Sequence, residues 1–167
     1  MTAPAPAQRR RWLLLGASLL LAACAQPART LPQGDDTWRG RLALQVEDSS
    51  AQSFSAAFEL QGDASRGALT LFNPLGNVLA RLTWQPGLAI LNDGKAEHRS
   101  ASLAALTREL TGSELPVAAW FEWLHGRETQ TTGWHVDLSA LASGRIVATR
   151  LQPLPRAVLR IVLEPSP

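Results

Sequence analysis

Apolar and polar residues alternate with a period of two along most of the chain beyond residue 38. Alternation over four to eight residues is typical of a β-strand that buries one face. The pattern predicts strands at residues 41–47, 53–60, 68–72, 78–84, 88–91, 95–99, 134–138, 145–151 and 157–163. Between the fifth and sixth strands, Asn92-Asp93-Gly94 is a strong hairpin turn, so neighbouring strands are expected to run antiparallel.

The period changes in the middle of the chain, where apolar residues recur at helical spacing. Ser100 or Ser102 can cap a first helix that ends at Gly112, and a second helix opens near Pro116 and ends at Gly126. Their apolar residues are Leu103, Leu106 and Leu110 in the first helix and Val117, Trp120, Phe121 and Leu124 in the second. The predicted fold class is therefore mainly β with a short α insert.

An antiparallel sheet with this alternation is apolar on one face throughout. That face must pack on another layer or curl around a cavity, and the two helices can cover the open side of a curled sheet. The candidate residues of this interior, and of an acyl-chain cavity within it, are Leu44, Phe58, Leu69, Trp84, Trp120 and Leu124. Ordinary core packing and a pocket for lipid chains use the same residue types, so composition alone does not separate them.

The first 24 residues have the order of a bacterial export signal. The cluster Arg9–Arg11 precedes an apolar run, Trp12–Leu21, that is too short to span a bilayer comfortably. Leu21-Ala22-Ala23-Cys24 follows, and it resembles the lipobox of bacterial lipoproteins, in which the Cys carries a diacylglycerol. An ordinary secretory signal that happens to contain a Cys is the alternative.

This signal sets the expected domain organisation. Residues 1–23 are a signal peptide that is removed, residues 24–37 are a lipid anchor and linker, and residues 38–167 are a single domain. Cys24 is the only cysteine, so no intramolecular disulfide is possible. By resemblance to bacterial lipoproteins, Ala25 rather than Asp after the Cys favours the outer membrane, facing the periplasm.

The net charge of +2 does not indicate a nucleic-acid partner. Arg9–Arg11 belong to the signal peptide, and without them the mature chain is near neutral. It has no basic stripe of the kind that follows a phosphate backbone.

Residues with catalytic or metal-binding chemistry are few and scattered. His98, His125 and His135 have no metal-ligand spacing. His135 and Asp137 share a strand face, but no Ser stands in a nucleophile elbow, and there is no glycine-rich phosphate loop. These residues therefore argue against an enzyme and against a metal site.

One predicted turn carries a large apolar residue. Phe72-Asn73-Pro74-Leu75-Gly76 links the third and fourth strands, and its Asn, Pro and Gly suit the first, second and fourth positions of a type I turn. Leu75 then stands at the outer corner, where an apolar side chain gains nothing in water. It either folds back onto the sheet or remains exposed.

Several of these segments together resemble the LolB family of outer-membrane lipoprotein receptors. In this order they are fairly specific and run over most of the mature chain. The segments are the lipobox at Cys24, Gly40–Leu44, Asn73–Gly76, Leu115–Val117, Trp123–Gly126 and Gly133–Trp134.

The resemblance implies a half-open antiparallel β-barrel with an α-helical lid and a hydrophobic cavity. The cavity would accept the acyl chains of lipoproteins delivered by the periplasmic carrier LolA, and the receptor would release them into the outer membrane. Leu75, with Pro74 and Gly76, matches the family's membrane-insertion loop. The resemblance also implies a protein that is not an enzyme and uses no cofactor. The implied partners are a LolA-like carrier, lipoprotein cargo and outer-membrane lipid, and the receptor is expected to be a monomer. A lipid- or peptide-sensing lipoprotein of the same fold and a periplasmic hydrolase are the other function classes.

Two stretches depart from the family pattern. Members commonly carry a helix between the anchor and the first strand, where this chain has only residues 34–38. Residues 126–133 are also brief where longer members have additional strand. A smaller barrel with a shallower cavity is therefore expected.

Overall fold

The computed structural model describes residues 37–47, 53–111, 114–129, 131 and 133–165. The predictions for Cys24, for the signal peptide and for the helix stop at Gly112 concern residues outside this range. So does the predicted linker at residues 24–37 except for Thr37, which is the first residue of the first strand. Among the described residues, no helix is long and apolar enough to cross a bilayer.

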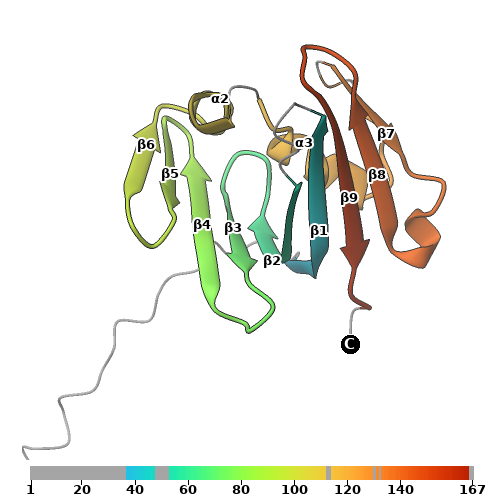
Figure 1. The fold of residues 1–167 in the computed structure, drawn as a ribbon, viewed down its shortest axis with the longest axis horizontal. Coiled ribbons are helices and arrows are strands. Elements are labelled where there is room, and N and C mark those ends of the chain that lie inside the picture. The colour runs from blue at the N-terminus through green and yellow to red at the C-terminus, as the bar shows by residue number, and fades with distance from the viewer. Residues whose placement is uncertain (1–36, 48–52, 112–113, 130, 132, 166–167) are drawn as a thin grey trace, which may run out of the picture. The chain divides into compact units, whose positions relative to one another are not determined.

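The described chain forms one antiparallel sheet of nine strands, in the order β6-β5-β4-β3-β2-β1-β9-β8-β7 (Figure 1). The strands are β1 (Thr37–Glu47), β2 (Ser53–Gly62), β3 (Gly67–Phe72), β4 (Val78–Gln85), β5 (Leu88–Asn92), β6 (Glu97–Ser100), β7 (Trp134–Asp137), β8 (Arg145–Arg150) and β9 (Arg156–Leu163). Each lies where alternation predicts a strand. The last strand pairs with the first, so β9 extends the sheet on the other side of β1.

A few strand ends differ from the predicted bounds, and the largest difference is that β1 begins at Thr37 rather than at Arg41. The predicted strand at residues 95–99 begins only at Glu97, because Asp93 Oδ1 accepts the backbone N–H groups of Lys95 at 2.9 Å and Ala96 at 2.8 Å. These hydrogen bonds also lower the pKa of the Asp93 carboxyl. The predicted strand at residues 145–151 ends one residue early, which leaves Leu151 outside the sheet.

The predicted helical insert is confirmed between β6 and β7. It consists of α2 (Leu103–Thr111) and α3 (Val117–Leu124), and a 3-10 turn, η1 (Leu141–Ser143), follows β7. Ser102 caps α2, because its hydroxyl accepts the backbone N–H of Ala105 at 3.1 Å, whereas Ser100 ends β6. The sequence left these two serines as alternatives.

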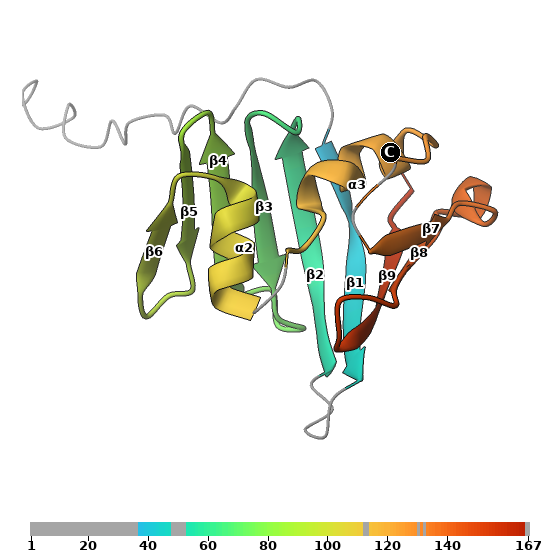
Figure 2. The ribbon, with the colours of Figure 1, turned by 90° about the horizontal axis from the view of Figure 1, so that it is seen from above.

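The sheet curls, and its two edge strands, β6 and β7, do not pair with each other. Figure 2 shows α2 and α3 on the concave side, with α3 nearer the start of β1, and α2 contacts β5 and β6. The predicted half-open barrel with a helical insert is confirmed.

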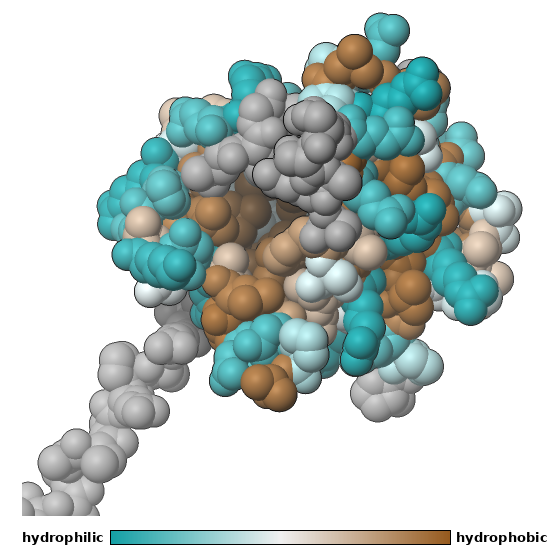
Figure 3. Space-filling model, in the orientation of Figure 1, coloured by the Kyte–Doolittle hydropathy of each residue, from teal (hydrophilic) through white to brown (hydrophobic). Residues whose placement is uncertain are grey.

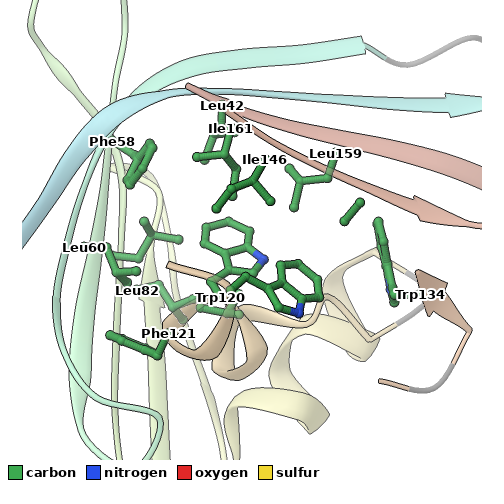
Figure 4. Close-up of a cluster of buried hydrophobic side chains, with 14 of the residues drawn as sticks. Leu42, Phe58, Leu60, Leu82, Trp120, Phe121, Trp134, Ile146, Leu159 and Ile161 are labelled. Carbon is green, nitrogen blue, oxygen red and sulfur yellow. The ribbon is translucent and has the colours of Figure 1, made fainter. Parts of the chain in front are cut away.

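Aromatic side chains close one end of this curled sheet. Phe121 of α3 lies edge-on to Trp38 of β1, with ring centroids 5.5 Å apart, and to Trp84 of β4 at 6.1 Å. Trp84 Nε1 also donates to the Asp63 carbonyl at 3.0 Å. Figure 4 shows apolar side chains of the sheet, among them Leu42 and Ile161, directed towards Trp120 on the helical side. The aromatic residues of α3 therefore fill the interior near the start of β1.

A buried cation holds the loop between β8 and β9 (residues 151–155). Arg150 is only 3% exposed, and its Nη2 and Nε donate to the Pro155 carbonyl at 2.9 and 3.3 Å. The guanidinium carbon also lies 5.4 Å from the centroid of the Trp134 ring. Burial lowers the pKa of Arg150, and the carbonyl and the ring offset part of the cost of burying its charge.

Gly133 packs against the backbone of the same loop. Its φ of +76° suits glycine, and a Cβ there would lie 1.8 Å from the Gln152 carbonyl oxygen. Gly133 and Trp134, noted in the sequence as opening a strand, therefore both contact the base of the β8–β9 loop.

We expect Gly133→Ala to lower the free energy of unfolding by more than about 2 kcal/mol, because it combines a positive φ with a backbone clash. Gly87→Ala is the matched control, since Gly87 has a φ of +79° and an added Cβ would meet no atom within 4 Å. Its expected cost is about 1 kcal/mol. Urea unfolding followed by tryptophan fluorescence measures both, and equal losses would contradict the bracing role of Gly133.

Candidate functional site: an apolar cavity and its rim

A cavity of about 220 Å³ lies between the concave face of the sheet and the helical insert. Its lining comes from β1 to β5, β9, both helices and their connection. These residues are Leu42, Leu44, Phe54, Leu69, Leu71, Ala80, Leu82, Leu91, Leu106, Thr107, Leu115, Val117, Trp120 and Leu159. None of these described lining residues has an ionisable side chain. The Thr107 hydroxyl, the one hydroxyl group among them, donates to the Ala104 carbonyl at 3.2 Å and accepts the Leu115 N–H at 3.3 Å.

Strand register explains how these side chains meet. Leu69 pairs with Leu82, which in turn pairs with Leu91 on the next strand. Paired residues of antiparallel strands point to the same face, so these leucines form a row across the sheet. On β1, Leu44 pairs with Phe54 on one side and Leu159 on the other, which extends the apolar face across the middle of the sheet.

The structure brings three of the six predicted interior residues together at the cavity, namely Leu44, Leu69 and Trp120. Phe58 and Trp84 are buried but do not line it. Leu124, in the last turn of α3, is partly buried against the core and is likewise absent from the lining.

Several lining residues that were not predicted for the interior nevertheless carry a signal in the sequence. Leu42 and Leu82 alternate in phase with Leu44 and Trp84, so period two places them on the interior face. Alternation shows which residues point to the interior face of the sheet. It does not show which of them a helix covers and which are left to border the cavity. The distinction between core and cavity depends on where α3 packs.

The histidines do not form a site. His98 on β6 is half-buried and pairs with Leu91, whereas His135 on β7 is exposed. His125 follows α3, where its Nδ1 lies 2.6 Å from the Phe121 carbonyl and its ring is edge-on to Trp38. Within the described ranges, no group of three His, Cys, Asp or Glu residues is placed to hold a metal ion.

The acidic residues with shifted pKa values lie in turns and on the helix surface. The Ser65 hydroxyl and the N–H groups of Ser65 and Arg66 lower the pKa of Asp63. The ion pair with Arg127, at 2.6 Å, lowers the pKa of Glu122 on α3. These shifts are explained by local structure, and neither carboxylate lines the cavity.

The cavity opens at the end of the sheet where β1 ends and β2 begins. Phe54, the second residue of β2, lines the cavity and is 40% exposed. The β3–β4 turn lies at this end too, as do the β5–β6 turn and the β8–β9 loop (Figure 2). Figure 3 looks onto this end and shows a hollow bordered by hydrophobic side chains.

Leu75 projects from the β3–β4 turn and is 86% exposed. Of the two alternatives for this residue, the exposed one is therefore the one the structure adopts. The turn is closed by a hydrogen bond from the Gly76 N–H to the Asn73 carbonyl at 2.9 Å. Asn73 Oδ1 accepts the N–H groups of Leu75 at 2.9 Å and Asn77 at 3.0 Å.

The start of β4 enlarges this apolar tip. Phe72 pairs with Val78 and Leu71 with Ala80, so Leu79 is an extra residue in β4, as in a β-bulge. Val78 and Leu79 are both exposed beside the turn. The cavity mouth thus has an uncharged, apolar projection on one side.

An antiparallel sheet curled around a partly open apolar cavity is the architecture of a binding protein for apolar ligands. The family model described as "Outer membrane lipoprotein LolB" matches residues 37–152. The chain therefore belongs to the LolB family of outer-membrane lipoproteins.

Individual relatives agree with this family. The chain is 31% identical to the outer-membrane lipoprotein LolB of Bordetella petrii over 184 aligned positions, which cover 93% of this chain and 92% of the relative. It is 35% identical to that of Cupriavidus necator over 125 positions, covering 70% and 63% of the two chains. It is 29% identical to that of Yersinia pseudotuberculosis over 151 positions, covering 79% and 73%.

The cavity geometry predicts that filling it weakens the binding of aliphatic chains. Ala80→Phe places a ring in the cavity, and we expect a fluorescent long-chain fatty acid to bind about tenfold more weakly, since two displaced methylenes are worth about 1.6 kcal/mol. Ala43→Phe, on the opposite face of β1, is the matched control and should leave affinity unchanged. Equal affinity of both variants and the unchanged chain would show that the ligand binds elsewhere.

Proposed function

We propose that this outer-membrane lipoprotein accepts lipoproteins from a LolA-like periplasmic carrier by their acyl chains and inserts them into the outer membrane. The observation that carries the proposal is the apolar cavity that opens beside the exposed Leu75 turn. Membership of the LolB family makes it an outer-membrane lipoprotein receptor.

The cavity supplies the acceptance step. Acyl chains cannot cross an aqueous compartment exposed, because each methylene in water costs about 0.8 kcal/mol. A dry apolar cavity of about 150 Å³ holds a benzene molecule in another protein, so about 220 Å³ accommodates a segment of an acyl chain. Longer stretches would require α2 to move away from β5 and β6, the strands that it contacts.

The β3–β4 turn is suited to the delivery step. Within residues 73–77, the N–H groups of Asn73, Leu75, Gly76 and Asn77 are all hydrogen-bonded inside the turn, and Pro74 has none. The turn also carries no charged residue. It can therefore enter a lipid interface without leaving backbone donors unsatisfied, and Leu75 gains roughly 1.5–3 kcal/mol on burial.

A sensor of lipids or peptides would use the same cavity but has no need of an apolar side chain projecting beside its mouth. Exposed leucine in water has no stabilising role in the free protein. The 86% exposure of Leu75 therefore favours delivery over sensing.

The lipid on Cys24 and the linker would keep the receptor at the membrane. β1 begins at the end of the sheet opposite the cavity mouth, and its 11 residues are at most about 35 Å long. Residues 25–36, fully extended, reach about 40 Å. The linker is therefore just long enough for the cavity mouth to face the membrane that holds the anchor.

Leu75→Glu should block delivery while leaving acceptance and folding nearly intact. The side chain contributes little to the core, and a carboxylate resists entry into lipid. Leu75→Phe is the matched control, which keeps an apolar group and should deliver normally. Cargo transfer from a LolA-like carrier to the receptor, and from the receptor to vesicles, measures the two steps separately.

A different pattern would overturn the proposed role of Leu75. If Leu75→Glu lowers the melting temperature sharply and loses acceptance and delivery together, the residue is structural. If Leu75→Glu delivers cargo at the normal rate, the turn is not needed for release.

Deleting residues 27–36 should abolish delivery without releasing the receptor from the membrane. The shortened linker reaches only about 10 Å, so the mouth can no longer face the anchoring bilayer. Replacement of the same residues by Gly and Ser keeps the length and should retain delivery. Membrane fractionation and delivery assays distinguish these outcomes, and normal delivery by the deletion variant would contradict the proposed orientation.

A further inference from the structure

The β8–β9 loop (residues 151–155) is a second apolar projection at the open end of the sheet. Leu154 is 75% exposed and Leu151 is 50% exposed. Neither belongs to the cavity lining or the core, and neither is part of the β3–β4 turn. The sequence presents this loop only as a Pro-containing break between two strands.

The exposed apolar residues are distributed unevenly over the described part of the chain. The large ones are Phe54, Leu75, Val78, Leu79, Leu151, Leu154 and Val162. All except Val162 lie at or next to the open end, because β2 and β4 begin there and β8 ends there. Val162 lies near the end of β9, where that strand pairs with the first half of β1. Scattered exposed apolar residues need no explanation, but their concentration at one end does.

The two apolar projections lie on opposite sides of the cavity mouth. Figure 1 places the β3–β4 turn and the β8–β9 loop at opposite edges of the view, and Figure 2 places both on the same end of the sheet. Figure 3 shows hydrophobic side chains at both places, with the hollow between them. A flat apolar surface that touches both projections would therefore lie across the mouth.

The composition of the β8–β9 loop fits a lipid surface. Residues 151–155 carry no charge, and Pro153 and Pro155 have no N–H groups that would need a partner away from water. The Pro155 carbonyl already accepts the buried Arg150 guanidinium. Gly133 and Trp134 brace the base of the loop, so Leu154 is presented by a supported backbone.

We infer that the β8–β9 loop is a second membrane-contacting element, and that Leu154 and Leu75 together seat the cavity mouth flat on the phospholipid bilayer. This inference rests on the proposed function, because the membrane is the surface to which the receptor delivers. With two contacts on opposite sides, acyl chains pass from cavity to lipid without crossing water. A single contact at Leu75 would leave the mouth free to tilt away from the bilayer.

Depth-sensitive labelling of the lipidated protein tests the contact directly. In that protein the Cys24 sulfur is blocked by its lipid, so a cysteine introduced by Leu154→Cys is the only free thiol. It is labelled with an environment-sensitive NBD probe in vesicles of phosphatidylethanolamine and phosphatidylglycerol. Leu75→Cys serves as the reference for the first contact. Val162→Cys, exposed by 47% near the other end of the sheet, is the negative control.

We expect spin-labelled lipids to quench the probes at positions 154 and 75, but not the probe at position 162. Quenching at 75 without quenching at 154 overturns the inference and leaves the proposed function standing. Quenching at neither 154 nor 75 overturns both. If the probe at 154 responds only to an added LolA-like carrier, or only at high receptor density, its partner is that protein or a second copy, and the inference is wrong.

Delivery kinetics provide an independent readout. Leu154→Glu should slow delivery to vesicles about tenfold with acceptance unchanged, by the loss of one leucine's partitioning into lipid. Leu154→Phe keeps an apolar side chain and should deliver normally.

Val162→Glu is the matched charge control. Its neighbours across the strands are Arg41 and Arg145, which can pair with the new carboxylate, so this variant should fold and deliver normally. A Leu154→Glu variant that delivers at the normal rate, or that fails in acceptance instead, would overturn the inference.

Discussion

The concave face of the sheet carries more apolar surface than two short helices can cover, and the remaining features of the structure depend on this mismatch. The aromatic residues of α3 fill the space near Trp38 and Trp84, while α2 contacts mainly β5 and β6. Between them a cavity of about 220 Å³ stays open. An acyl chain that enters this space removes both its own surface and the leucine-lined walls from water, so the hydrophobic effect favours its binding.

The antiparallel topology separates the closed and open ends. In the antiparallel meander of β1 to β6, every second connection lies at the same end of the sheet. β9 runs antiparallel to β1 and begins at that end too, since Glu47 at the end of β1 pairs with Arg156 at the start of β9. The β3–β4 turn and the β8–β9 loop therefore lie at one end, although they are far apart in sequence. The aromatic cluster around Phe121 closes the other end. The cavity mouth and both exposed apolar projections are thereby confined to the same end of the sheet.

The sequence predicts the elements well because their signals are local. Period-two alternation, with the Asn92-Asp93-Gly94 turn for β6, locates the nine described strands, and the helical spacing of apolar residues locates both helices. The cavity is predicted less completely, because alternation places Phe58 and Leu42 equally on the interior face. Both side chains belong to the buried core, but only Leu42 also borders the cavity, a difference that depends on how the helices pack over the sheet. Leu154 could not be singled out from the sequence for a related reason. The path of its loop is set by tertiary contacts, because Arg150 binds the Pro155 carbonyl and Gly133, from a separate segment, packs against Gln152.

The small volume of the cavity has a functional consequence for the direction of transfer. Each acyl-chain methylene that does not fit inside the cavity stays in water. Moving that methylene into the bilayer is favourable by about 0.8 kcal/mol. A receptor that enclosed its cargo completely would compete with the membrane on equal terms, and release would then require an energy source. A cavity that holds only a segment of an acyl chain binds cargo against water but loses it to lipid. In the proposed orientation, with the mouth held on the bilayer by the two apolar projections, this difference in coverage would favour transfer of the acyl chain from cavity to lipid.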